Sequence, residues 1–439
     1  MDLLQNHKPR TSLQKGLTIE YLSYILLLLY IFTMPFVSAF AFTGTISLPL
    51  IFAVFLLMLM IVKTLQSGKL PPGFLGFDVL IILFFLFLTI FSFLINGLGN
   101  SKSFNHTVAY LSSFILFYIT IKFVLFNTNN KIRLFKKVLK VITYTCLISG
   151  TYAIIEFIFS NAFGVNLNDY IPRPTETEAY YKALVLGTYY RARGFAPESG
   201  HFAFMMEMFS PLAVYYMYFS KFCRWNRIVK GIIVVIILLS IIFTVSTASF
   251  IIIPIAILFA LIFYIKNIWA YLKRHPFKFA LSTVLSSVVI VLFNYYLSFY
   301  AFIILSISAK MDSNSFDDRQ NRINFFYDNF SKLDFIHKLV GTGAAGYDVL
   351  GFDESNAILS LYYSITFELG FLGVFLLLLL FVYFMYQTIR IKSSIRFFLL
   401  IAVSSGIMHY IFIANFWYPW FWFIAAFTIF CNNFLGKEN

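Results

Sequence analysis

Long apolar runs separated by short polar segments make up most of the chain. A helix of roughly 17–25 apolar residues is long enough to cross the ~30 Å hydrocarbon layer of a membrane, and about 12 such runs occur. We therefore predict an all-α, polytopic membrane protein that forms a single integral membrane domain over residues 1–439. The predicted spans cover 21–42, 47–62, 77–95, 106–126, 138–160, 202–220, 229–246, 248–265, 279–303, 357–386, 397–413 and 417–435.

Lysine and arginine gather in alternate connections between these runs. The basic segments, counted with Lys122 and Lys437, hold 23 of the 33 Lys and Arg residues and only four Asp and Glu residues. Cytoplasmic loops carry such an excess, so both termini are predicted to be cytoplasmic. The net charge of +14 is then a signal of topology, and nucleic acid is not an expected partner.

Composition supports the same class of protein. Apolar residues make up 60% of the chain, charged residues 12%, and the mean hydropathy is +0.82. A soluble domain is normally about half apolar and about a quarter charged, so much of this surface needs membrane lipid as its solvent. The three scattered cysteines indicate neither a disulfide framework nor a metal site.

Two connections on the face opposite the basic segments are long. They cover about 161–201 and 304–356, and together they hold most of the acidic residues. Long loops are usually functional. Prolines exclude an uninterrupted helix in the first loop. In the second, apolar residues recur at near-helical spacing over 319–336, which predicts an amphipathic helix on the membrane surface or against the ends of the spans.

Arginines occur in pairs in both long loops: Arg191 with Arg193, and Arg319 with Arg322. The planar guanidinium matches phosphate oxygens, so such pairs at a membrane surface could bind a lipid diphosphate. They could equally pair with neighbouring acidic residues or contact lipid headgroups.

Candidate proton acceptors lie just before and inside the spans. Glu198 and His201 are one turn apart if a helix begins near Pro197, and either could take a proton from a sugar hydroxyl. Glu198 could instead be an acid at a helix N-terminus, and His201 a simple hydrogen-bonding group. Three further acids lie within predicted spans, where carboxylates are costly and usually face a cavity or a partner. They are Glu156, Glu207 and Glu368.

Other chemistries have no support in the sequence. There is no GxxxxGK[ST] loop and no HExxH zinc signature. The adjacent Asp317 and Asp318 are a weak signal for a divalent cation. We expect a metal-independent mechanism without a cofactor.

Two segments of the chain resemble the O-antigen polymerase and ligase superfamily. Residues 191–203, RARGFAPESGHFA, are similar to the R-x-x-G-x-x-x-E-P/S segment of Wzy-type O-antigen polymerases. The second segment, within 319–373, has an Arg followed by an aromatic residue, a G-x-G turn, a polar pair and an E-L-G sequence. These are Arg322, Phe326, Gly341-Thr342-Gly343, Ser355-Asn356 and Glu368-Leu369-Gly370.

The resemblance implies a GT-C-like glycosyltransferase in the bacterial inner (cytoplasmic) membrane. It would join oligosaccharide repeat units carried on undecaprenyl diphosphate into O-antigen or a related surface polysaccharide, with a chain-length-regulating co-polymerase as a partner. The four arginines and Asn356 would bind substrate. Glu198, which matches the acidic position of the polymerase segment, is preferred to His201 as the base.

Two alternatives remain. An O-antigen ligase would use the same donor and transfer the glycan to lipid A-core, but the ligase branch commonly has His-Asn where this chain has Ser355-Asn356. A lipid-linked oligosaccharide flippase would have a similar number of spans. Flippases are expected to show two related halves and cations in the middle of their spans, and neither is visible, because the lysines within the predicted spans, such as Lys122 and Lys140, lie near the basic ends.

Overall fold

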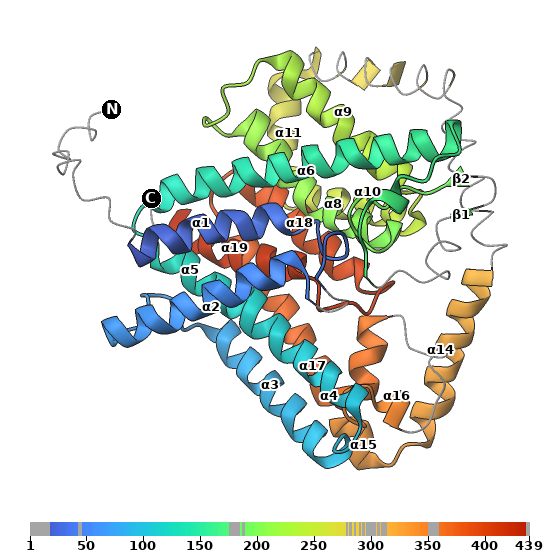
Figure 1. Cartoon of the computed structure of the whole chain (residues 1–439). Coiled ribbons are helices and arrows are strands. Elements are labelled where there is room, and N and C mark those ends of the chain that lie inside the picture. Colours follow the sequence, from blue (N-terminus) through green and yellow to red (C-terminus); the bar gives the residue numbers. More distant parts are fainter. Residues whose placement is uncertain are drawn as a thin grey trace.

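A bundle of helices forms almost all of the structure that we describe, which is a computed structural model (Figure 1). It describes residues 18–42, 46–174, 185–186, 189–277, 314–349 and 360–435, with isolated residues between 278 and 313. The helices are α1 (Ile19–Thr33), α2 (Leu48–Ser67), α3 (Phe77–Asn96), α4 (Ser101–Phe114), η1 (Ile115–Ile119), α5 (Thr120–Asn127), α6 (Lys131–Ala162), η2 (Leu167–Tyr170), α8 (Ser199–Val214), η3 (Tyr215–Phe219), α9 (Arg227–Phe243), α10 (Thr247–Ile262), α11 (Ile265–Arg274), α14 (Asn314–Lys332), α15 (Phe335–Val340), α16 (Gly346–Val349), α17 (Leu361–Arg390), α18 (Ile395–His409) and α19 (Pro419–Leu435).

Polar residues of the short connections cap these helices. Asn100, Asn130 and Asn226 each begin a helix by accepting hydrogen bonds from backbone N–H groups of its first turn, at 2.8–3.0 Å. Gly68 ends α2 in the left-handed conformation that glycine adopts most readily. The apolar runs therefore become helices with defined ends.

The all-helical prediction is confirmed for the described residues, apart from a two-residue pairing of β1 (Val185–Leu186) with β2 (Tyr189–Tyr190). Within the residues that the structure describes, five helical segments are long and apolar enough to cross a membrane: α2, α3, α4 through α5, α6 and α17. The helices α1, α10, α18 and α19 are apolar but shorter. The predicted span 279–303 lies almost wholly outside the described residues.

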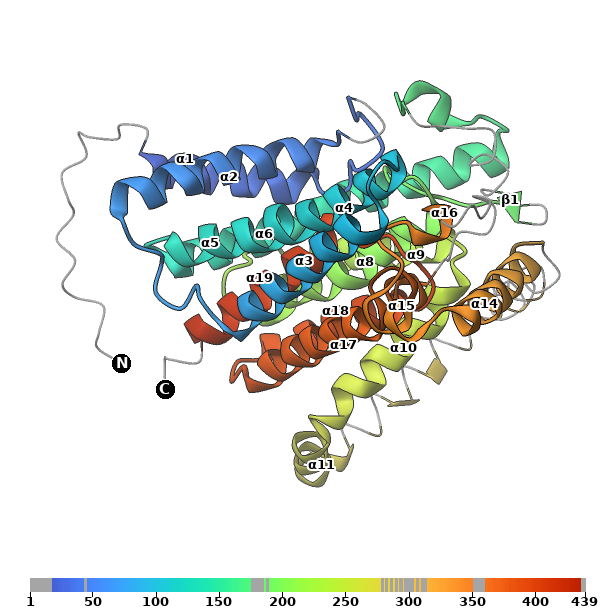
Figure 2. The same ribbon diagram turned by 90° about the horizontal axis from the view of Figure 1, so that it is seen from below.

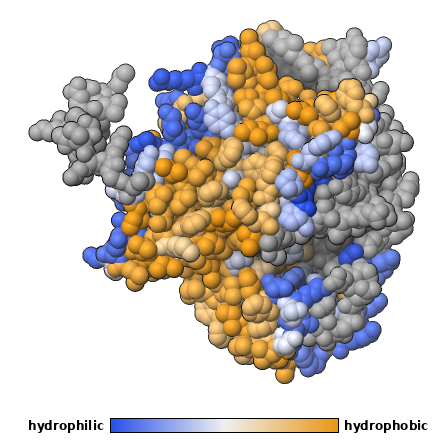
Figure 3. Space-filling model, viewed as in Figure 1, coloured by the Kyte–Doolittle hydropathy of each residue, from blue (hydrophilic) through white to orange (hydrophobic). Residues whose placement is uncertain are grey.

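The surface agrees with a membrane environment. Hydrophobic residues cover a broad band, and hydrophilic residues gather toward the two ends of the molecule (Figure 3). The two termini lie at one end of the helices, and β1, α14 and α16 lie at the other (Figure 2).

The centre of the bundle is built around α8 and α19. Nearly every residue of α19 from Pro419 to Cys431 is buried, as is most of α8. The Trp420 indole donates to the Met34 carbonyl oxygen at 2.8 Å, which ties α19 to the end of α1. A helix that is apolar on all sides belongs in such an interior position.

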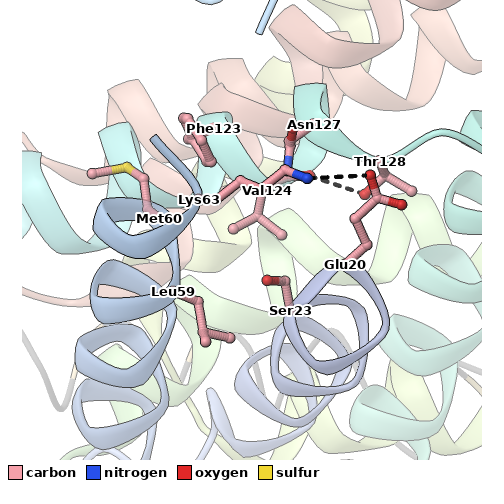
Figure 4. A pocket seen from close by; sticks show the side chains of 9 residues that line it. All are labelled: Glu20, Ser23, Leu59, Met60, Lys63, Phe123, Val124, Asn127 and Thr128. Atoms are coloured by element: carbon pink, nitrogen blue, oxygen red, sulfur yellow. Dashed lines mark hydrogen bonds and ion pairs between the residues drawn. The ribbon is translucent and has the colours of Figure 1, made fainter. Parts of the chain in front are cut away.

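A small hollow lies near the end of the bundle that carries the termini. It lies between α1, α2 and α5, and the Glu20 and Lys63 side chains meet there at 3.9 Å (Figure 4). Both side chains are partly exposed, as expected of a surface ion pair.

The second long loop is fixed to a break in α17. Gly370 has φ 67° and ψ −167° and interrupts the helix. The turn at Gly341–Gly343 fills the break: the Gly343 N–H donates to the Glu368 carbonyl oxygen at 3.0 Å, and the Thr342 N–H donates to that of Phe367 at 3.0 Å. A Cβ on Gly341 would lie 2.1 Å from the Glu368 oxygen, so only glycine fits.

The predicted amphipathic helix exists with shifted boundaries. It was expected over 319–336, whereas α14 ends at Lys332 and a separate helix, α15, begins at Phe335. The reason is local, because the Asp334 side chain caps α15 by accepting from the His337 N–H at 2.9 Å. On α14, Phe326 packs against Tyr363 of α17, with ring centroids 4.7 Å apart.

Candidate functional site

A buried carboxylate organises the end of the first long loop. Glu156, near the end of α6, accepts from the Arg193 N–H at 3.1 Å and the Gly194 N–H at 2.8 Å. Its other oxygen accepts from the Asn168 amide at 2.8 Å. Arg173 donates to the Gly194 carbonyl oxygen at 2.7 Å and the Ala196 carbonyl oxygen at 2.6 Å. This network fixes the path of residues 191–197.

Arg193 is part of that network. Its side chain is 1% exposed and donates to the Asn168 side chain at 3.2 Å and the Pro197 carbonyl oxygen at 3.1 Å. These contacts give Arg193 a structural role in shaping the loop, in addition to the substrate-binding role predicted for it.

Arg191 lies half-buried beside the start of α8. Its Nε donates to the Thr244 carbonyl oxygen at 3.0 Å, which attaches the loop to the end of α9. Burial lowers the pKa of the guanidinium to about 10, the Glu198 carboxylate opposes that shift, and the Arg319 guanidinium adds to it. Arg191 is therefore protonated at neutral pH and lies within electrostatic range of a second arginine from the other long loop.

Glu198 and His201 lie at the first turn of α8, as the sequence predicted. Glu198 is the N-cap residue, but its side chain makes no capping hydrogen bond. His201 is buried, and its ring meets that of Tyr418 at a centroid distance of 4.9 Å. Burial lowers the pKa of the imidazole, Glu198 opposes that shift and His409 adds to it. His201 is therefore predominantly neutral at pH 7 and can accept a proton.

A further ionisable pair lies deeper in α8. Glu207 and His409 are both buried, with Nδ1 of His409 2.9 Å from Oε2 of Glu207. The sequence predicts that a carboxylate at Glu207 faces either a cavity or a partner, but it gives no indication that the partner is His409. That pairing joins residues 202 positions apart.

The remaining predicted residues are not brought together in the same way. Arg322 lies three residues beyond Arg319 on α14 and is half-buried. Asn356 lies outside the described residues. In the second long loop, His337 pairs at 2.6 Å with Asp334 on an exposed surface. Among the described residues, no group of three His, Cys, Asp or Glu side chains could hold a metal ion.

No protein-family model and no curated protein matches the chain. The resemblance to the polymerases therefore rests on the two sequence segments alone.

Proposed function

We propose that the chain is a metal-independent membrane glycosyltransferase that polymerises polyprenyl-diphosphate-linked oligosaccharide repeat units. The observation that carries the proposal is the position of Arg191, which is held against the end of α9 by its hydrogen bond to Thr244 and is acted on electrostatically by Glu198 of the first long loop and Arg319 of the second. Two guanidinium groups repel each other, so an anionic ligand that contacts both would be stabilised electrostatically. A lipid diphosphate has the charge and the location that this site requires.

The residues fit the chemistry of the transfer. A hydroxyl oxygen of the acceptor attacks the anomeric carbon of the donor, and the bond from that carbon to the diphosphate oxygen breaks. The leaving diphosphate keeps the electron pair, and its charge is stabilised by Arg191 and Arg319. The hydroxyl proton passes to Glu198, or alternatively to His201, as the new glycosidic bond forms.

The finer topology belongs to the same proposal. We infer about 12 spans with both termini in the cytoplasm, because connections rich in Lys and Arg alternate along the chain with connections that lack them. The two long loops belong to the second group, so the catalytic site would lie on the outer face of a bacterial inner membrane. The substrate would be an undecaprenyl-diphosphate-linked oligosaccharide of O-antigen or a related polysaccharide. A chain-length-regulating co-polymerase would be a partner.

The test uses purified protein in lipid nanodiscs with lipid-linked repeat units from the native host. Arg191→Ala and Arg319→Ala should each abolish polymer and leave single repeat units, while lysine at either position should restore only part of the activity. Lys332→Ala is the matched control, since this exposed cation lies on the same helix as Arg319 and should not matter. Long chains from both alanine variants would refute diphosphate binding by these residues.

Deletion of the gene in the native host, together with the nanodisc assay, separates the alternatives. Loss of a ligase leaves free lipid-linked polymer in the cell, whereas loss of a polymerase leaves single repeat units. A flippase would give no polymer in nanodiscs with any variant.

A further inference from the structure

A second polar cluster lies near the same end of the bundle, around the break in α17. The Glu368 side chain is completely buried. Its Oε2 accepts from the Tyr110 hydroxyl at 2.7 Å, and its Oε1 lies 3.3 Å from the Ser364 hydroxyl and 3.2 Å from Nδ1 of His106. His106, near the start of α4, keeps 22% of its side chain exposed. A buried carboxylate thus lies within ion-pair distance of a partly exposed imidazole.

Aromatic rings from two other segments flank this imidazole. Tyr347 of α16 lies 6.4 Å from the His106 ring, and Trp417 of the connection between α18 and α19 lies 5.8 Å from it, both edge to face. Nζ of Lys102 lies 5.8 Å from the centre of the Tyr347 ring. Three parts of the chain that are far apart in sequence therefore converge on His106.

The cluster adjoins the arginine site. Tyr418 packs on His201, and the ring of Trp417 is 6.3 Å from that of Tyr418. His201 and His106 are thus separated by two consecutive aromatic residues.

We propose that His106, oriented by Glu368 and flanked by Tyr347 and Trp417, forms a carbohydrate subsite for the acceptor glycan. The partly exposed Trp417 ring suits the C–H face of a pyranose, the buried Tyr347 ring supports the imidazole from the other segment, and the imidazole can exchange hydrogen bonds with the sugar hydroxyl groups. A neutral sugar fits this position better than an anionic ligand, because the Glu368 carboxylate would repel a negative charge. This assignment rests on the proposed function for its biological ligand, and it makes His106 a positioning residue while Glu198 or His201 takes the proton.

The test is binding, measured separately from turnover. The probe is the water-soluble oligosaccharide released by mild acid from the host's lipid-linked repeat unit, titrated by calorimetry into protein in nanodiscs. His106→Gln and Trp417→Ala should each weaken binding about ten-fold or more, the effect of losing roughly 1.4 kcal/mol of contact. Arg191→Ala should bind the free glycan normally. Trp269→Ala is the matched control, because Trp269 is 61% exposed on α11.

Kinetics provide a second measurement that a purely structural role would not produce. In polymerisation assays the same two variants should raise KM for the repeat unit about ten-fold with little change in kcat. If the wild-type protein fails to bind the free glycan, or if both variants bind it normally, the subsite is refuted. If glycan binding depends on His106 and Trp417 but no polymer forms, the subsite stands and the proposed function fails.

Discussion

The buried ion pair of Asp78 and Lys122 should contribute measurably to the free energy of unfolding. Both side chains are fully buried, and Nζ of Lys122 lies 2.5 Å from Oδ2 of Asp78, which also accepts from the Tyr118 hydroxyl at 2.5 Å. The ammonium lies 5.7 Å from the centres of the Phe74 and Phe126 rings. Neither charge can reach water without moving these neighbours. Removal of one partner therefore leaves the other as a buried, uncompensated charge.

The expected magnitudes differ between the single and double variants. Lys122→Met should lower the free energy of unfolding by about 3–5 kcal/mol, since it strands the Asp78 carboxylate. Asp78→Asn should cost somewhat less, because cation–π contacts of roughly 0.5–2 kcal/mol still stabilise the ammonium. The double variant Asp78→Asn/Lys122→Met should be more stable than Lys122→Met alone, because no unpaired charge remains.

The assay is reversible unfolding in mixed micelles with increasing SDS, followed by circular dichroism. Lys63→Met is the control, because Lys63 and Glu20 form a partly exposed pair at 3.9 Å that should contribute no more than about 1 kcal/mol. Additive losses in the double variant, or a Lys122→Met variant as stable as the control, would show that the pair is not energetically coupled.

Three further predictions concern the base, the pH dependence and the orientation. Glu198→Gln should slow polymerisation by about 100-fold or more while His201→Gln retains most activity, and the opposite order would make His201 the base. Thermal stability should fall as the pH drops below about 6.5, because the unfolded chain binds a proton at His201 that the folded protein binds only at lower pH. His201→Gln should make that fall shallower, and an unchanged fall would contradict it. In a variant without the native cysteines, single cysteines at the exposed positions Asp169 and Ser331 should react with a membrane-impermeant thiol reagent in whole cells whose outer membrane has been permeabilised. One at Ser67 should react only after the inner membrane is broken, and earlier labelling would reverse the orientation.

The sequence alone predicted those features of the fold that depend on residues close together along the chain. Apolar runs predicted helices, and the near-helical spacing over 319–336 predicted the helix that contains Arg319. The first turn of α8 was also expected at Glu198 and His201. Each of these depends on periodicity and capping, which a single sequence displays directly.

Contacts between distant segments could not be predicted from the same patterns. The Gly341 turn and the helix break at Gly370 both stood out in the sequence, but nothing indicated that one fills the other. Arg193 matched phosphate chemistry as well as Arg191 did, and only its hydrogen bonds to the loop distinguish the two. His106 gave no signal, because a lone histidine near the end of a span usually needs no explanation.

The described helices contain four buried carboxylates, of which one lies near the end of the bundle that carries the termini and three lie toward the opposite end. Asp78, near the end that carries the termini, is compensated by Lys122, so its burial needs no ligand. Glu156, Glu207 and Glu368 all lie within about three turns of the helix ends that lead into the long connections. Their closest contacts include amide, imidazole and hydroxyl groups, which allow a carboxyl group to change its hydrogen bonding or protonation without losing a permanent ion pair. Carboxylates at membrane depth are costly and are usually retained for function. Their gathering at one end therefore supports the proposed position of the site there, by an argument that does not depend on the two arginine pairs.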